Sequence, residues 1–189
     1  EKKRQILEYE EAMTRQLARR VVDKPVPPIW MILIPIFFVF HAWKIKEYSN
    51  GLKSFAEHYL LSRRRALDTA CESEIGGTQP DIDQLLEKNN AIPASASSCY
   101  RTWITLLINH YCNLLKAPGN RVHELIRSHY RNKSTYLLFN NQLRTAENSY
   151  NVSLLPKIEG DQQDLRYVLD KMEQGITDLQ RKEVEDVFS

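Results

Sequence analysis

Residues 26–43 read VPPIWMILIPIFFVFHAW and carry no formal charge. The centre of this run, residues 29–40, is apolar at every position, so a helix formed here has no polar face to present to water. Such a helix must be buried in lipid or in protein, and no other segment of the chain is apolar enough to surround it. Trp30 and Trp43 bracket the run as aromatic anchors bracket a membrane interface. We therefore expect residues 26–43 to be inserted in a membrane.

The sequence leaves the geometry of this insertion open. As a helix the run is roughly 27 Å long, which barely matches the ~30 Å hydrocarbon core of a bilayer. Pro35 removes one backbone hydrogen bond at its centre and allows a kink or a reversal. Basic residues flank both ends, so the positive-inside preference gives no orientation. A short span, a re-entrant or monotopic insertion, and a helix buried in a partner protein all fit. The predicted membrane-contacting residues are Ile29, Trp30, Leu33, Pro35, Phe37, Phe38, Phe40 and Trp43.

Amphipathic helices are predicted on both sides of the apolar run. Residues 1–25 place apolar side chains every three or four positions, which indicates a helix with one buried face. Residues 44–76 predict a long stalk helix, continuous with the membrane helix and ended by Gly76 and Gly77. Its apolar residues form a coiled-coil-like seam, and we expect them to pair with another helix. These residues are Ile45, Tyr48, Leu52, Phe55 and Tyr59.

The remainder of the chain also reads as helices. Residues 77–148 predict a helical hairpin region, in which a helix ending before Pro118 and a second helix over residues 121–148 pack antiparallel. Residues 149–189 predict a loop and then a C-terminal helix with a shorter seam. No segment alternates apolar and polar residues long enough to form a convincing strand. The chain is therefore predicted to be all-α. The seam residues of the last helix are Leu165, Leu169, Met172 and Ile176.

Charge and cysteine content narrow the choice of partner and compartment. The chain of 189 residues has a net charge of +2, too balanced for a protein that grips nucleic acid. Residues 1–65 hold 13 basic and 7 acidic side chains, whereas residues 66–189 hold 13 and 17. A basic half that contains the apolar run suits anionic lipid headgroups, although solvated helix faces explain the same charges. Three cysteines without paired spacing favour a reducing compartment.

No motif in the sequence gives a reason to propose catalysis. The segment from His123 resembles the start of a zinc-protease helix, but Arg127 occupies the position of the second ligand. The sequence therefore predicts no catalytic residue, no metal site and no cofactor. We expect a non-catalytic, membrane-anchored helical subunit that scaffolds or tethers a protein complex. Its partners would be the bilayer and other protein subunits, in a homo-oligomer or a larger assembly, with most of the chain on the cytoplasmic side.

An alternative function uses the histidines. A small membrane-bound redox or transport subunit could bind haem or quinone through helical imidazoles that meet inside a bundle. One of them ends the apolar run, and at the last turn of that helix it would reach the membrane interface. The candidate residues are His41, His58, His110 and His129.

Overall fold

A computed structural model of the protein describes residues 1–24, 36–87, 92–157 and 162–189. Within these ranges the chain forms helices and no strand, which confirms the all-α prediction. The helices are α1 (Lys2–Val21), α2 (Ile36–Gly76), α3 (Ile82–Glu87), α4 (Ser97–Lys116), α5 (Val122–Tyr130), α6 (Lys133–Leu154) and α7 (Gln162–Phe188), with 3-10 turns at Ala94–Ala96 and Leu155–Lys157.

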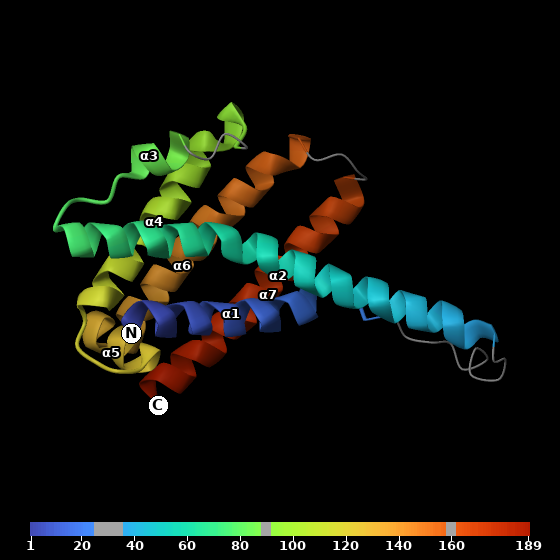
Figure 1. Ribbon diagram of the computed structural model, residues 1–189, viewed down its shortest axis with the longest axis horizontal. Helices are drawn as coiled ribbons and strands as arrows, with labels where there is room; N and C mark the ends of the chain where they lie inside the picture. The colour runs from blue at the N-terminus through green and yellow to red at the C-terminus, as the bar shows by residue number, and fades with distance from the viewer. Residues whose placement is uncertain (25–35, 88–91, 158–161) are drawn as a thin grey trace.

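The helices form two layers. α1 and α2 lie antiparallel in one layer, and α4, α6 and α7 cross behind them (Figure 1). The first part of α2 projects beyond the bundle at one end, whereas both chain termini lie at the opposite end (Figure 1). The bundle therefore has two different ends along α2, which we call its poles. The first part of α2 projects from one pole, and the chain termini lie at the other.

α4 is the central helix of the bundle. It packs closely on α2 because α2 presents small residues, Ala66, Ala70 and Ser73, at buried positions. Lys2 donates hydrogen bonds from Nζ to the carbonyl oxygens of Leu115 (3.0 Å) and Ala117 (2.7 Å), which satisfies carbonyl groups that have no partner at the end of α4. The buried residues of α4 are Tyr100, Trp103, Ile104, Leu107, Ile108, His110, Tyr111, Cys112 and Leu114.

α2 ends where the glycine pair predicts. Its last residue is Gly76, and Gly77 adopts a φ of 62°. This left-handed conformation costs a glycine little and is strained for other residues, so it stops the helix at a fixed place.

The helix predicted over residues 121–148 is wrong as a single element. The chain breaks at Arg131, whose φ is 64°, and restarts at Asn132, whose side chain accepts a hydrogen bond from the Thr135 amide at 2.8 Å. This is an ordinary N-cap, and it begins a new helix, α6. α6 continues past the predicted end at residue 148. The predicted antiparallel packing on α4 is present, since the ring of Tyr150 stacks on the ring of Trp103.

The transmembrane helix predicted over residues 26–43 is not supported. Among the helices in the described ranges, none is long and apolar enough to cross a membrane. The physical reason is that α2 is uninterruptedly apolar only over residues 36–40 and carries charged side chains from Lys44 onward. Residues 26–35 of the apolar run lie outside the described part of the chain.

Candidate functional site

The described segments before and after the apolar run contact each other. A Cβ atom built on Gly51 of α2 would lie 3.5 Å from Cγ1 of Val22, the residue that follows α1. The end of α1 therefore touches the middle of α2, and the first part of α2 continues beyond that contact (Figure 1). Residues 23–50 accordingly start and finish at one pole of the bundle.

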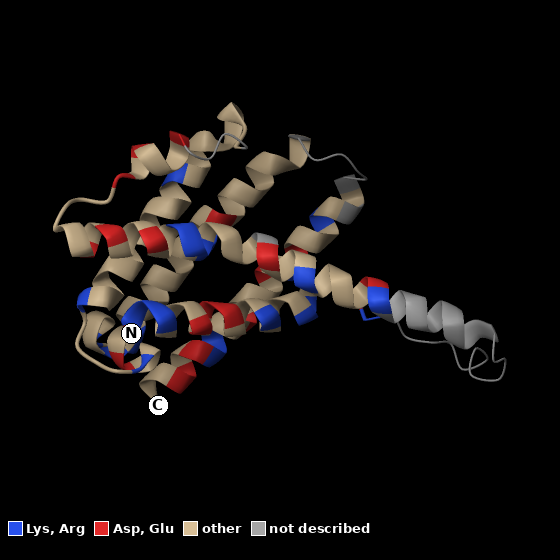
Figure 2. Ribbon diagram, in the orientation of Figure 1, with Lys and Arg blue, Asp and Glu red and all other residues tan. Residues whose placement is uncertain are grey.

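Basic side chains gather around this pole. Figure 2 shows Lys and Arg on both α1 and α2 next to the projecting part of α2. Two residues at the end of α1 are tied to α7, because Arg20 pairs with Asp178 at 2.8 Å and Asp23 pairs with Lys171. Residues 15–24 and 46–57 together contain six basic and three acidic residues. These are Arg15, Arg19, Arg20, Lys24, Lys46 and Lys53 against Asp23, Glu47 and Glu57.

The residues predicted to contact the membrane fall into two groups. Phe37, Phe38, Phe40 and Trp43 lie on the first turns of α2, of which the backbone is described. The other predicted residues lie outside the described ranges, namely Ile29, Trp30, Leu33 and Pro35.

The predicted helix-pairing residues of α2 and α7 meet inside the chain. Phe55 and Tyr59 of α2, and Met172 and Ile176 of α7, pack on one cluster with residues of α1. The approach of α7 to α1 is close, because a Cβ atom on Gly175 would lie 2.9 Å from Cδ1 of Leu17. A large part of both seams is therefore covered by α1. Four other predicted residues are half-buried, namely Tyr48, Leu52, Leu165 and Leu169, and for Ile45 the backbone alone is described.

A buried ion-pair cluster lies where α1, α2 and α6 meet. The guanidinium of Arg63, 9% exposed, lies 3.2 Å from carboxylate oxygens of both Glu10 and Glu147. Arg63 also donates a hydrogen bond to the Tyr59 hydroxyl at 3.0 Å, and Tyr111 of α4 donates to Glu10 at 2.8 Å. The Glu147 side chain is 4% exposed, and its burial raises the pKa of that carboxyl while the charge of Arg63 opposes the shift. The cluster thus ties four helices through groups that are costly to separate.

A second buried carboxylate lies on α7. Oε1 of Glu183 accepts hydrogen bonds from the hydroxyls of Tyr9 (2.5 Å) and Tyr136 (2.6 Å). Burial raises the pKa of Glu183 to about 7, although the two tyrosine hydrogen bonds lower it. This carboxyl therefore titrates near neutral pH, at the junction of α1, α6 and α7.

The two clusters face a small internal cavity of about 70 Å³. Glu10, Arg63 and Glu183 line it together with His110 and Asn140. The Nδ2 atom of Asn140 is buried and has no hydrogen-bond partner among the described residues. A cavity of this size has room for water but is far below the about 300–1,000 Å³ of sites that enclose small molecules or cofactors. The polar side chains that form part of its otherwise apolar lining offer hydrogen-bond partners to such a water.

Of the four histidines considered for haem or quinone, the structure describes the side chains of two, His110 and His129, and both rings contact the ring of Tyr130. His110 is buried, and its Nδ1 lies 2.7 Å from the Tyr130 hydroxyl. Burial lowers the pKa of His110 to about 3, so its imidazole is neutral at physiological pH. His129 is exposed on α5, and the side chains of His41 and His58 lie outside the description. No group of three or more potential metal ligands occurs among the described residues.

Sequence reasoning did not single out the buried ionic residues. Arg63 lies in a run of three arginines within the basic flank of the apolar run, and nothing in the local sequence distinguishes Glu10, Glu147 and Glu183 from surface carboxylates.

Comparison with known proteins adds no family assignment, because no family model, no curated protein and no solved structure significantly matches the chain.

Proposed function

We propose that this protein is a non-catalytic, membrane-attached helical subunit that inserts residues 26–43 into one face of a bilayer as a hairpin. The observation that carries the proposal is the contact between Val22 and Gly51. A single crossing would place α1 and the body of α2 on opposite sides of the membrane, whereas these helices pack against each other. A hairpin keeps both of them on one side and lets the apolar run leave and return.

The dimensions favour insertion into a single leaflet. Residues 36–51 of α2 extend about 22 Å as a helix, which is roughly half of the ~40–45 Å thickness of a complete bilayer. Residues 23–35, at up to about 3.3–3.6 Å each, are long enough to return over that distance. The basic residues at the base of the hairpin would then lie at the headgroups, where each contributes about 1 kcal/mol on an anionic surface.

The rest of the chain suits a tether for other proteins. Its three cysteines are free, which is typical of a reducing compartment and supports a cytoplasmic location of the bundle. Leu138 and Val152 of α6 are exposed apolar residues on the bundle, available for contact with a further subunit.

The first test is flotation with lipid vesicles. We expect the wild-type protein to float with phosphatidylcholine vesicles and the double variant Phe37→Asp/Phe38→Asp to remain at the bottom. Each aspartate in hydrocarbon costs about 2.5–3.5 kcal/mol, so the partition coefficient falls by more than about a thousandfold. The matched control is Leu138→Asp/Val152→Asp, which adds the same charge at exposed positions of α6 and should float like the wild type. A wild-type protein that never floats contradicts the proposal.

The second test distinguishes a hairpin from a crossing. On a background without the native cysteines, Val22→Cys combined with Gly51→Cys should form an intramolecular disulfide in the vesicle-bound protein, because the two positions are in contact. The control pair is Glu8→Cys with Gly51→Cys, in which the first residue lies about 20 Å further along α1, and it should not cross-link. A bound protein without the disulfide, whose two cysteines react from opposite sides, would overturn the hairpin.

A further inference from the structure

A groove runs between α1 and α2 on the side of the projecting helix. It has a volume of about 480 Å³, within the range of small-molecule sites. One wall is the face of α1 from Glu11 to Arg19, and the other is the face of α2 from Ser49 to Arg64. The wall on α2 is about 22 Å long. This "α1–α2 groove" is separate from the internal cavity described above.

The floor of the α1–α2 groove is apolar. Ala18, Leu52, Ala56 and Leu60 line it, and Leu61 is 45% exposed at its edge. From Leu52 to Leu61 this floor is about 14 Å long as a helix face. That length matches one acyl chain, since each leaflet of a bilayer is about 15 Å of hydrocarbon.

The rim of the groove carries an excess of positive charge. Arg64 pairs with Glu11 at 2.6 Å, but the other contacts are long, 3.8 Å from Arg15 to Glu11 and 3.9 Å from Lys53 to Glu57. Arg19 has no ion pair among the described residues. Exposed pairs of this length contribute little, so three cations can turn to an anion at little cost.

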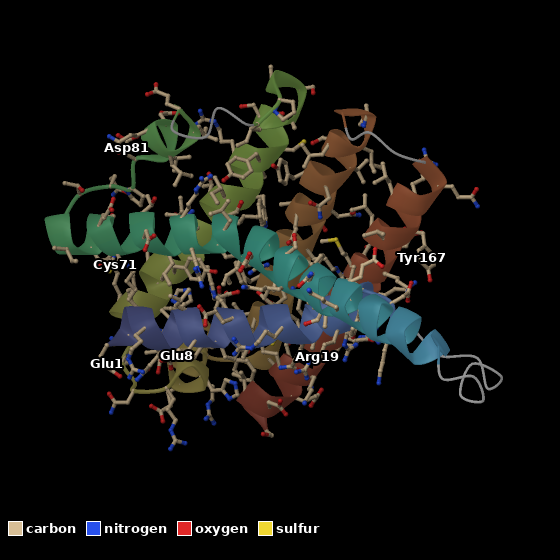
Figure 3. The ribbon with its side chains drawn as sticks, turned by 45° about the vertical axis from the view of Figure 1, so that its right-hand side comes forward. Glu1, Glu8, Arg19, Cys71, Asp81 and Tyr167 are labelled. Atoms are coloured by element: carbon tan, nitrogen blue, oxygen red, sulfur yellow. The ribbon has the colours of Figure 1, made fainter. Side chains whose placement is uncertain are left out.

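Arg19 and Lys53 lie at the end of the groove that is closest to the apolar run, and Arg15 lies about one turn away from Arg19 along α1. Arg19 is three residues before Val22, and Lys53 is two residues after Gly51, so both flank the contact at the base of the proposed hairpin. Figure 3 shows Arg19 on the last part of α1, beneath the section of α2 that continues out of the bundle. A phosphate held here would lie at the level of the headgroups.

We propose that the α1–α2 groove binds one anionic glycerophospholipid, with the phosphate between Arg15, Arg19 and Lys53 and an acyl chain along the floor from Leu52 to Leu61. The assignment rests on the proposed function, because the hairpin brings the groove to the bilayer. Charge complementarity favours an anionic headgroup, and the apolar floor favours a lipid over inorganic phosphate. Binding of this lipid adds selectivity for anionic membranes beyond the general attraction of the basic residues at the base of the hairpin.

The test compares flotation with neutral phosphatidylcholine vesicles and with vesicles that also contain phosphatidylglycerol. The wild-type protein should bind the anionic vesicles at least about tenfold more tightly, and Arg19→Gln/Lys53→Gln should lose about that factor while binding neutral vesicles as before. The matched control, Arg181→Gln/Lys182→Gln, removes the same charge from exposed positions near the end of α7 and should keep most of the gain.

A variant that fills the floor separates a bound lipid from general surface attraction. Ala56→Trp leaves every charge in place and should also lower the preference for anionic vesicles by about tenfold. Leu61→Gln at the exposed edge is the milder alternative if the first variant does not fold. An anionic preference that both variants leave undiminished, or that inorganic phosphate abolishes, overturns the proposal and leaves the groove to a protein partner, to surface charge alone or to a free anion.

The outcomes for the groove and for the hairpin remain distinguishable. Loss of binding to neutral vesicles with an intact anionic preference refutes the hairpin and keeps the lipid site. Neutral binding without any anionic preference refutes the lipid site and keeps the hairpin, and absence of binding to both refutes both.

Discussion

Replacing Arg63 with leucine is expected to lower the free energy of unfolding by about 3–5 kcal/mol near pH 8, the range found when one partner of a buried ion pair is removed. Glu147 would keep its buried carboxylate without a cation, and Glu10 would retain the Tyr111 hydroxyl as its main partner. Without the charge of Arg63, burial alone acts on Glu147 and raises the pKa of its carboxyl further. Because this raised pKa makes the folded variant bind more protons than the unfolded chain, the loss of stability should shrink near pH 5.

Two further variants test this prediction. Arg64→Leu removes the adjacent guanidinium, which is 50% exposed and pairs with Glu11, and it should cost at most about 1 kcal/mol. Arg63→Leu combined with Glu147→Gln should recover part of the loss, since no carboxylate is then left alone in the core. Urea unfolding at the two pH values measures all three. Equal losses for Arg63→Leu and Arg64→Leu would mean that the Arg63 cluster is solvated and not a buried ion pair.

Local signals in the sequence predict most of the helices. The glycine pair at residues 76–77 ends α2 because it supplies a left-handed stop, and the broad apolar stripe of α4 identifies a helix that is buried on most sides. The break at Arg131 was missed, although Asn132 followed by Thr135 is an N-cap signal. Apolar spacing continues across the break, so periodicity alone joins α5 to α6.

The partners of the amphipathic faces were not predictable in the same way. Seam periodicity shows that Tyr59 and Ile176 each face another helix, but it does not say which one. Both pack against α1, whose own apolar stripe lies more than 35 residues from one and more than 150 residues from the other. The seams therefore do not require another chain over these residues, and the case for further subunits now rests on exposed surfaces.

Charge burial depends on contacts between distant segments, and for that reason the sequence does not reveal it. In a run of three arginines on a helix, successive side chains point about 100° apart, so one of the three can face the core. Arg63 does so because Glu10 and Glu147 approach it from 53 and 84 residues away. The packing of α1 on α2 likewise joins segments that are far apart in sequence, and the apolar sequence between them alone allowed a span, a hairpin or a protein partner.

The largest pH-dependent effect is expected for Glu183→Gln. The pKa of Glu183 is about 7 in the folded protein against 4.5 in the unfolded chain. Between pH 4.5 and about pH 7 the folded protein keeps a proton on Glu183 that the unfolded chain has lost. The contribution of this residue to stability is therefore present at low pH and is lost as the pH rises toward 7 and above. A shift of this size corresponds to about 3 kcal/mol. Glutamine keeps an oxygen that accepts from Tyr9 and Tyr136 but never ionises, which removes the penalty.

The variant should therefore differ from the wild type in its pH profile more than in its stability at any one pH. Near pH 5 glutamine and the protonated carboxyl are similar, and the variant should be equal to the wild type or about 1 kcal/mol less stable because its amide brings one more buried donor. Near pH 8 the free energy of unfolding of the variant should exceed that of the wild type by about 3 kcal/mol more than it does near pH 5.

Glu185→Gln is the control, since that carboxylate lies two residues further along α7, is 69% exposed and pairs with Lys133. Its effect should stay below about 1 kcal/mol at both pH values. Thermal or urea unfolding across this pH range decides the question. Parallel curves for the wild type and Glu183→Gln would show that Glu183 is already ionised well below neutral pH, which would require the tyrosine hydrogen bonds and Arg63 to outweigh its burial.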